Sequence, residues 1–427
     1  MSGRDYSKQV EKRQKIKKTT LVVGLDIGKE FNAMGLMNKE GEVIGRYPKI
    51  YNSRRGFEYF KKEVEDTKRR NGLKRVIIGM EPTGHYWRKI AFYAKEEGYE
   101  TKFIRTTATK HQRELDESSS AKTDMKDALT IANITREGKY IDTVIEDGMM
   151  RELRTLGKLR EKIMVGNTAS RHRLGAVLDD YFPEIKRTFW SIKAKSLMAI
   201  LERCPYPKDV LKMEEKEIEE IIGKSSRRKK EAKEKAKEIY KAAKESIGLK
   251  NIGEGDRYRL KVNLEGIKQT EKEIKEVEKQ MEKILQKIPS AEIIQSIPGI
   301  GMITTAVFLG ELGDPKYFKG AKQIIKYAGY DPQENDSGKS VGRKTISKKG
   351  RWLLRKCLYF MGLGVVNNNT FFKEYYDRKL TTKNRFGQDL RKKEALCAVV
   401  IKLIKVIFAL LRDKKQFTEE RPVFARA

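Results

Sequence analysis

The chain has 427 residues, which is enough for two or three domains that each bury a hydrophobic core. Lys and Arg number 93 against 60 for Asp and Glu, so the formal net charge is +33 and the expected partner is a polyanion. The charge is spread along the whole chain, which favours nucleic acid over membrane lipid. The three cysteines and three histidines show no short spacing, which excludes a zinc ribbon or a disulfide framework and leaves oxygen as the ligand for any metal.

Neither the start of the chain nor its most apolar stretch indicates a membrane partner. Residues 1–20 form a charged, basic extension that is neither a signal peptide nor an anchor. The longest apolar run, Ala395–Leu411, is interrupted by Lys402 and Lys405 and is too short to span a bilayer, so it predicts a buried helix. We therefore expect a cytoplasmic protein.

Residues 21–146 show the pattern of an α/β domain, with elements in the order β-β-β-α-β-α-β-α. Three consecutive short strands predict an antiparallel meander, and the later strands alternate with helices as parallel crossovers do. This mixture is typical of an RNase H-like fold. The expected strands are Leu21–Leu25, Phe31–Met37, Val43–Tyr47, Val76–Met80 and Thr101–Ile104, and the expected helices lie near 56–70, 86–97 and 124–136.

Residues 147–289 lack a strand signal and show helical spacing, so the fold class is α/β plus all-α. The last part of this region carries a heptad pattern, with apolar residues seven apart at Leu260, Ile267, Ile274, Met281 and Ile288, and with Asn263, Thr270, Val277 and Ile284 at the intervening core position. The pattern predicts a coiled coil that joins protomers into a dimer or a tetramer. The alternative is an amphipathic helix that packs on its own chain.

The C-terminal third is expected to be mainly helical. It opens with Ser-Ile-Pro-Gly-Ile-Gly at 296–301, which resembles a helix-hairpin-helix motif. Such a hairpin presents backbone N–H groups to a DNA phosphate, and Gly299 and Gly301 would allow close approach. An ordinary turn between helices is the alternative. A basic stretch without any acid follows and predicts a phosphate-binding surface; it contains Lys339, Arg343, Lys344, Lys348, Lys349, Arg351, Arg355 and Lys356.

Four acidic residues form the candidate catalytic site. Asp26 and Glu81 end the first and fourth expected strands, which are neighbours in an RNase H-like sheet. Asp124 and Asp127 are three residues apart on an expected helix and therefore share one face. Four close carboxylates repel one another unless cations neutralise them, and oxygen ligands favour Mg²⁺ or Mn²⁺. Two such ions can support an in-line phosphoryl transfer. For any single one of these acids, the alternative role is a helix cap or an ordinary surface charge.

These motifs resemble those of the DEDD transposases of insertion sequences. The resemblance rests on Gly-Leu-Asp-Ile-Gly around Asp26, Glu-Pro-Thr-Gly-His-Tyr at 81–86, Lys-Thr-Asp-Met-Lys-Asp-Ala at 122–128 and the Ile-Pro-Gly-Ile-Gly block with its basic tail. That family is related to the Piv-type invertases, and its N-terminal domain resembles the Holliday-junction resolvase RuvC. The resemblance covers about 21–369 and implies that Asp26, Glu81, Asp124 and Asp127 are the metal-binding catalytic quartet.

The resemblance also implies a serine nucleophile that forms a transient phosphoserine bond with DNA. Ser337, in the segment 330–338, matches the family's position, and Ser340 and Ser347 are nearby rivals. The implied partners are donor DNA, target DNA and a structured guide RNA.

The expected domain plan has five parts. They are the basic extension 1–20, a RuvC-like catalytic domain 21–146, a helical and coiled-coil region 147–289, a C-terminal transposase domain 290–370 and a helical tail 371–427. Two other functions are compatible with the sequence: a structure-selective Holliday-junction nuclease that uses water as the nucleophile, and a nucleic-acid-binding protein without enzymatic activity.

Overall fold

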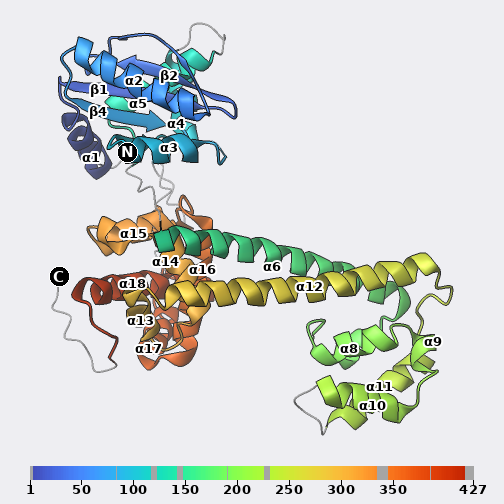
Figure 1. Cartoon of the computed structure of the whole chain (residues 1–427). Coiled ribbons are helices and arrows are strands. Elements are labelled where there is room, and N and C mark those ends of the chain that lie inside the picture. Colours follow the sequence, from blue (N-terminus) through green and yellow to red (C-terminus); the bar gives the residue numbers. More distant parts are fainter. Residues whose placement is uncertain are drawn as a thin grey trace. The chain divides into compact units, whose positions relative to one another are not determined.

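Figure 1 shows the computed structural model of the chain, which describes residues 3–82, 84–116, 123–141, 148–189, 191–225, 231–333, 345–384 and 386–418. The chain divides into two compact units, called here the N-terminal unit (Met1–Ile145) and the C-terminal unit (Glu146–Ala427). Within the described ranges, no helix is both long enough and apolar enough to cross a membrane.

The N-terminal unit is built on a five-stranded sheet with the strand order β3-β2-β1-β4-β5. Strands β1, β2 and β3 are antiparallel neighbours, and β4 and β5 run parallel to β1, which confirms the expected meander followed by parallel crossovers. The elements are α1 (Gly3–Gln14), β1 (Thr20–Ile27), β2 (Phe31–Met37), β3 (Lys49–Tyr51), α2 (Arg54–Arg70), β4 (Arg75–Met80), α3 (Trp87–Glu96), β5 (Glu100–Phe103), α4 (Thr106–Asp116) and α5 (Asp124–Arg136).

The third strand lies later in the chain than the sequence indicated. The expectation of a strand over Val43–Tyr47 is wrong, because only an isolated bridge joins Val43 to Met37 there. The third strand of the meander, on the other side of β2 from β1, is Lys49–Tyr51. Gly45 adopts a positive φ of 89°, which breaks the extended backbone within the expected strand. Helix α4 was also not expected from the sequence.

A row of three glycines allows α5 to lie directly on the sheet. Gly24 of β1 pairs with Gly35 of β2 on one side and with Gly79 of β4 on the other. A Cβ atom added to Gly24 would lie 2.0 Å from the backbone oxygen of Ala128, so only glycine permits this approach. Helices α2 and α3 cover the opposite face, where Phe60, Ile90 and the odd-numbered residues of β1 form a second apolar layer.

Where the structure describes the C-terminal unit, its elements are helices and one two-stranded pairing, of β6 with β7. Its helices are α6 (Gly148–Tyr181), α7 (Ile185–Thr188), α8 (Lys195–Arg203), α9 (Pro207–Val210), α10 (Glu215–Ser225), α11 (Ala232–Lys244), α12 (Glu254–Leu285), α13 (Pro289–Gln295), α14 (Met302–Leu312), the 3₁₀ helix η2 (Pro315–Tyr317), α15 (Ala321–Ala328), α16 (Trp352–Asn368), α17 (Thr370–Leu380) and α18 (Lys392–Asp413). The strands are β6 (Pro332–Gln333) and β7 (Thr345–Ile346). The run Ala395–Leu411 lies within α18, which confirms the expected buried helix.

The heptad seam of α12 is covered by α6 of the same chain, and the two long helices lie side by side in Figure 1. Arg160 pairs with Glu278 and Asn167 donates to the hydroxyl of Thr270, so the helices run antiparallel. Ile267 and Met281 are completely buried there. The seam therefore has a partner helix without a second protomer, and the expectation that it must find one in another chain loses its physical basis.

Two apolar cores lie along this helix pair. One contains the first half of α6, the end of α12 and the helices from α13 to α18. The other contains the end of α6, the start of α12 and the helices from α7 to α11.

Candidate active site

The ends of two parallel strands place the first two acids side by side. Leu25 of β1 pairs with Met80 of β4, so the next residues in register are Asp26 and Glu81. Side chains alternate along a strand, and both carboxylates therefore point to the same face as Gly24 and Gly79, which is the face covered by α5. Each of the two acids is partly buried.

The other two acids lie in the first turn of α5. The side chain of Thr123 caps this helix by accepting a hydrogen bond from the backbone N–H of Lys126. Asp127 is 4 % exposed and directly precedes Ala128, whose carbonyl meets Gly24, whereas Asp124 is exposed one turn earlier on the same side of the helix. The positive end of the helix dipole favours carboxylates at these positions.

Glu81 has a buried partner that the sequence analysis missed. The hydroxyl of Thr109 in α4 donates to Oε2 of Glu81 at 2.7 Å, and Thr109 is 2 % exposed. The same hydroxyl also lies 2.9 Å from the carbonyl oxygen of Thr106. No sequence signal indicates this contact, because α4 itself is not expected from the sequence and a lone threonine marks no site.

The backbone brings the four acids to one edge of the sheet, but their side chains do not form a closed metal cluster. Among the described residues, no group of three or more His, Cys, Asp or Glu side chains is close enough to hold a metal ion. The donor set consists entirely of carboxylates, which fits hard divalent cations such as Mg²⁺ or Mn²⁺ better than softer metals. The residues therefore suit such an ion chemically.

The predicted nucleophile Ser337 and its rival Ser340 lie outside the described residues, as do Lys339, Arg343 and Lys344. The described residues on either side are held together, because Ser347 donates its backbone N–H to the carbonyl of Asp331 and its hydroxyl to the carboxylate of Asp331. The pairing of β6 with β7 extends the same connection. Gln333 and Thr345, the described residues on either side, thus lie opposite each other.

The described basic residues divide into two groups. Lys348 and Lys349 are exposed. Arg351 donates to the carbonyl of Glu311 and stacks on Tyr327 with 4.7 Å to the ring centroid, and Arg355 donates to the carbonyls of Ala328 and Lys348. These two arginines thus support the fold around the end of α14 and α15.

The glycines of the hairpin between α13 and α14 differ in their surroundings. Gly299 has a φ of 94°, and an added Cβ atom would lie 2.2 Å from the carbonyl oxygen of Gly364 in α16, so this glycine permits close packing of the hairpin on α16. Gly301 precedes the first residue of α14, and an added Cβ atom would meet nothing within 4 Å. Of the two, Gly301 is the one that leaves room for a ligand.

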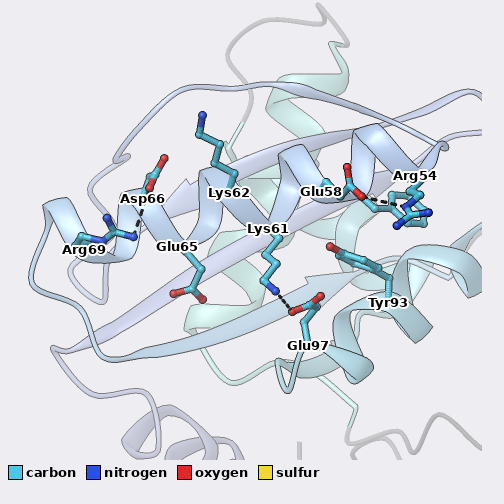
Figure 2. A pocket seen from close by; sticks show the side chains of 10 residues that line it. Arg54, Glu58, Lys61, Lys62, Glu65, Asp66, Arg69, Tyr93 and Glu97 are labelled. Atoms are coloured by element: carbon cyan, nitrogen blue, oxygen red, sulfur yellow. Dashed lines mark hydrogen bonds and ion pairs between the residues drawn. The ribbon is translucent and has the colours of Figure 1, made fainter.

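A groove of about 780 Å³ lies between α2 and α3 of the N-terminal unit, on the side of the sheet opposite to α5 (Figure 2). Its charged side chains largely neutralise one another, with ion pairs between Lys61 and Glu97 and between Arg54 and Glu58. The residues that line it include none of the four candidate acids. The groove is therefore not part of the candidate active site.

Comparison with known proteins identifies two matching families. The DEDD transposase domain of IS110, described as a transposase, matches residues 23–183, and the transposase family of IS116, IS110 and IS902 matches residues 291–377. Together these matches cover more than half of the chain.

Individual relatives agree with these families. The 43.6 kDa protein of insertion element IS110 from Streptomyces coelicolor is 25% identical over 308 residues, which are 71% of this chain and 73% of that protein. The pilin gene-inverting protein of Moraxella bovis is 30% identical over 128 residues, 30% of this chain and 38% of that protein. The transposase of element IS1111A from Coxiella burnetii is 24% identical over 147 residues, 34% of this chain and 39% of that protein. The chain belongs to the IS110/IS116/IS902 family of insertion-sequence transposases and carries the DEDD domain of that family.

Proposed function

We propose that this protein is a site-specific DNA recombinase that moves an insertion sequence by divalent-metal-dependent strand cleavage and exchange. The observation that carries the proposal is the register between β1 and β4, which puts Asp26 beside Glu81 under the first turn of α5, in a chain that matches transposases over both of its units. In this arrangement all four acids would take part in metal binding, and the hydroxyl of Thr109 holds Glu81 in position by a hydrogen bond.

The roles follow from the chemistry of the groups. Asp26, Glu81, Asp124 and Asp127 would hold one or two Mg²⁺ or Mn²⁺ ions, which, when bound, neutralise the charge of the reacting phosphate. The hydroxyl of Ser337 would attack a DNA phosphate, forming a P–O bond to serine as the bond to the leaving sugar oxygen breaks. The serine proton passes to a base and the sugar oxygen takes up a proton. Attack by a sugar hydroxyl of the other DNA reverses the step and frees Ser337.

Partners follow from the same proposal. Donor and target DNA are the substrates, and a structured RNA that pairs with both would select the site. The charge of +33 suits a protein that holds RNA and DNA together. We also propose that the active form is a dimer or tetramer, since recombination joins two DNA molecules. Its interface is not the α12 seam, which α6 already covers.

The test is an assay with supercoiled donor and target DNA, with and without Mg²⁺, scored for recombined product and for a covalent protein–DNA adduct. Asp26→Asn, Glu81→Gln and Asp127→Asn should each abolish cleavage and still bind DNA, whereas Glu58→Gln, a matched change of an exposed acid on α2, should cleave normally. Ser337→Ala should remove the adduct and strand exchange, whereas Ser340→Ala and Ser347→Ala should keep them.

Other outcomes separate the alternatives. Cleavage without any adduct would identify a nuclease that uses water, and DNA binding without cleavage would identify a binding protein. Recombination at the correct site after complete RNase digestion would refute the proposal of a guide RNA, but the proposal that the protein is a recombinase would stand.

A further inference from the structure

One face of α16 exposes large aromatic side chains. Trp352 is 54 % exposed and Phe360 is 51 % exposed, while Leu354 and Leu358 on the other side of the helix are completely buried. Helical periodicity puts Trp352, Lys356 and Phe360 on the same face, together with the partly buried Tyr359 and Leu363. Tyr359 supports Phe360 in an edge-to-face contact with ring centroids 5.8 Å apart. We call Trp352, Lys356, Tyr359 and Phe360 the aromatic face of α16.

The charge around this face is positive. The sequence has no acidic residue between Asp336 and Glu374, so α16 contributes only cations to its own surface. Lys348 and Lys349 are exposed just before the helix, and Lys356 lies between the two rings. Glu161 of α6 forms an ion pair with Lys356 and offsets its charge, although the Lys356 side chain stays 43 % exposed, so Lys348 and Lys349 supply most of the net positive charge. The surroundings attract a polyanion.

Rings alternating with cations fit unpaired nucleotides better than other partners. A duplex offers phosphates and base edges, for which aromatic faces are not needed, whereas an unpaired base offers its flat face for stacking. Protein interfaces are enriched in aromatic residues but depleted in lysine, and here one lysine lies between the rings and two more precede the helix. Trp352 and Phe360 are eight residues apart, which is about 12 Å along a helix and leaves space for intervening nucleotides beside Lys356.

We propose that the aromatic face of α16 binds single-stranded DNA, with bases stacked on Trp352 and Phe360 and phosphates on Lys348, Lys349 and Lys356. The choice of DNA over RNA rests on the proposed function, because strand exchange exposes unpaired DNA.

The experiment measures fluorescence anisotropy of the full-length protein with a labelled dT 20-mer, a duplex of equal length and a matching rU 20-mer. Stacking is worth about 1–3 kcal/mol per base, so Trp352→Ala and Phe360→Ala should each weaken dT binding by about 5- to 150-fold. Duplex binding should change less than about 2-fold, because phosphate contacts remain. Trp352→Phe keeps a ring and should retain most of the affinity. Tyr258→Ala is the matched control, because Tyr258 is a 69 % exposed aromatic residue on α12.

A second readout uses intrinsic fluorescence. The chain has three tryptophans, Trp87, Trp190 and Trp352, and the dT 20-mer should quench the wild type but not Trp352→Phe. The assay needs no cleavage, so its result is independent of whether the protein recombines DNA. Unchanged dT affinity in both Ala variants, an equal loss for duplex, or tighter binding of rU through the same residues would overturn the proposal. A fall in oligomer mass caused by Trp352→Ala at unchanged dT affinity would instead assign the face to a second copy of the chain.

Discussion

Replacing Gly24 by Ala should damage both the stability of the N-terminal unit and the placement of the candidate acids. The new Cβ atom would lie 2.0 Å from the oxygen of Ala128 and 2.5 Å from the nitrogen of Ala132, which are backbone atoms of α5 and cannot rotate away. Ordinary van der Waals contact needs more than 3 Å, so α5 must move off the sheet by about 1 Å. Overpacking of this kind costs about 3 kcal/mol, which lowers the melting temperature by about 9 °C for a unit of this size.

The shift should also slow strand cleavage by about 100-fold, because α5 carries Asp124 and Asp127 and a misplacement of about 1 Å costs a rate factor of that order. Differential scanning calorimetry of the full chain measures the first effect and the plasmid assay measures the second. Gly166→Ala in α6 is the control, because an added Cβ there meets nothing within 4 Å and should stabilise the helix by about 0.5–1 kcal/mol. Wild-type melting and cleavage in Gly24→Ala would refute the close packing of α5 on the glycine row.

Two further predictions concern single side chains. Thr109→Val removes the hydrogen bond to Glu81 and should weaken Mn²⁺ binding, measured by isothermal titration calorimetry, by about 10- to 100-fold, since a hydrogen bond to a charged group contributes about 1.5–3 kcal/mol. Thr109→Ser should restore the affinity, and equal affinities of wild type and Thr109→Val would show that Thr109 has no positioning role. Burial raises the pKa of Glu65, but hydrogen bonds from Lys68 and Tyr99 outweigh it and lower this pKa below the ordinary 4.5. A lowered pKa stabilises the fold above the unfolded-state value and loses that stability as the pH falls through the folded-state value. Glu65→Gln should therefore flatten the loss of stability below about pH 4.5, measured by urea unfolding at several pH values, and identical acid profiles would contradict this.

Sequence patterns predicted most of the N-terminal sheet because its strands are short apolar runs between turns. They misplaced the third strand, since Val43–Tyr47 is apolar enough for a strand but contains Gly45, whose positive φ is visible only in three dimensions. The positions of Asp26 and Glu81 at adjacent strand ends followed from strand order. Thr109 could not be predicted, because a lone threonine carries no signal until α4 brings it to Glu81.

The heptad of α12 shows a second limit of sequence patterns. The seven-residue period correctly indicated a helix with a buried seam, but it contains no information on which chain supplies the partner. Here the partner helix is α6 of the same chain, whose Asn167 donates a hydrogen bond to Thr270 at the polar position of the seam.

The antiparallel pairing of α6 with α12 affects which part of the chain can vary in length or sequence without disturbing the rest of the fold. The path leaves α6 after Tyr181 and returns to α12 at Glu254, and the two points are adjacent, because the backbone N–H of Leu249 donates to the carbonyl of Asp180. The helices between them, α7 to α11, form an insertion closed at its base, whose apolar core also includes the end of α6 and the start of α12. Such an insertion can change its length or sequence without moving the core formed by α13 to α18. The two transposase matches end at residue 183 and resume at residue 291, so most of the interval without a match is this insertion and the α12 helix that leads back from it.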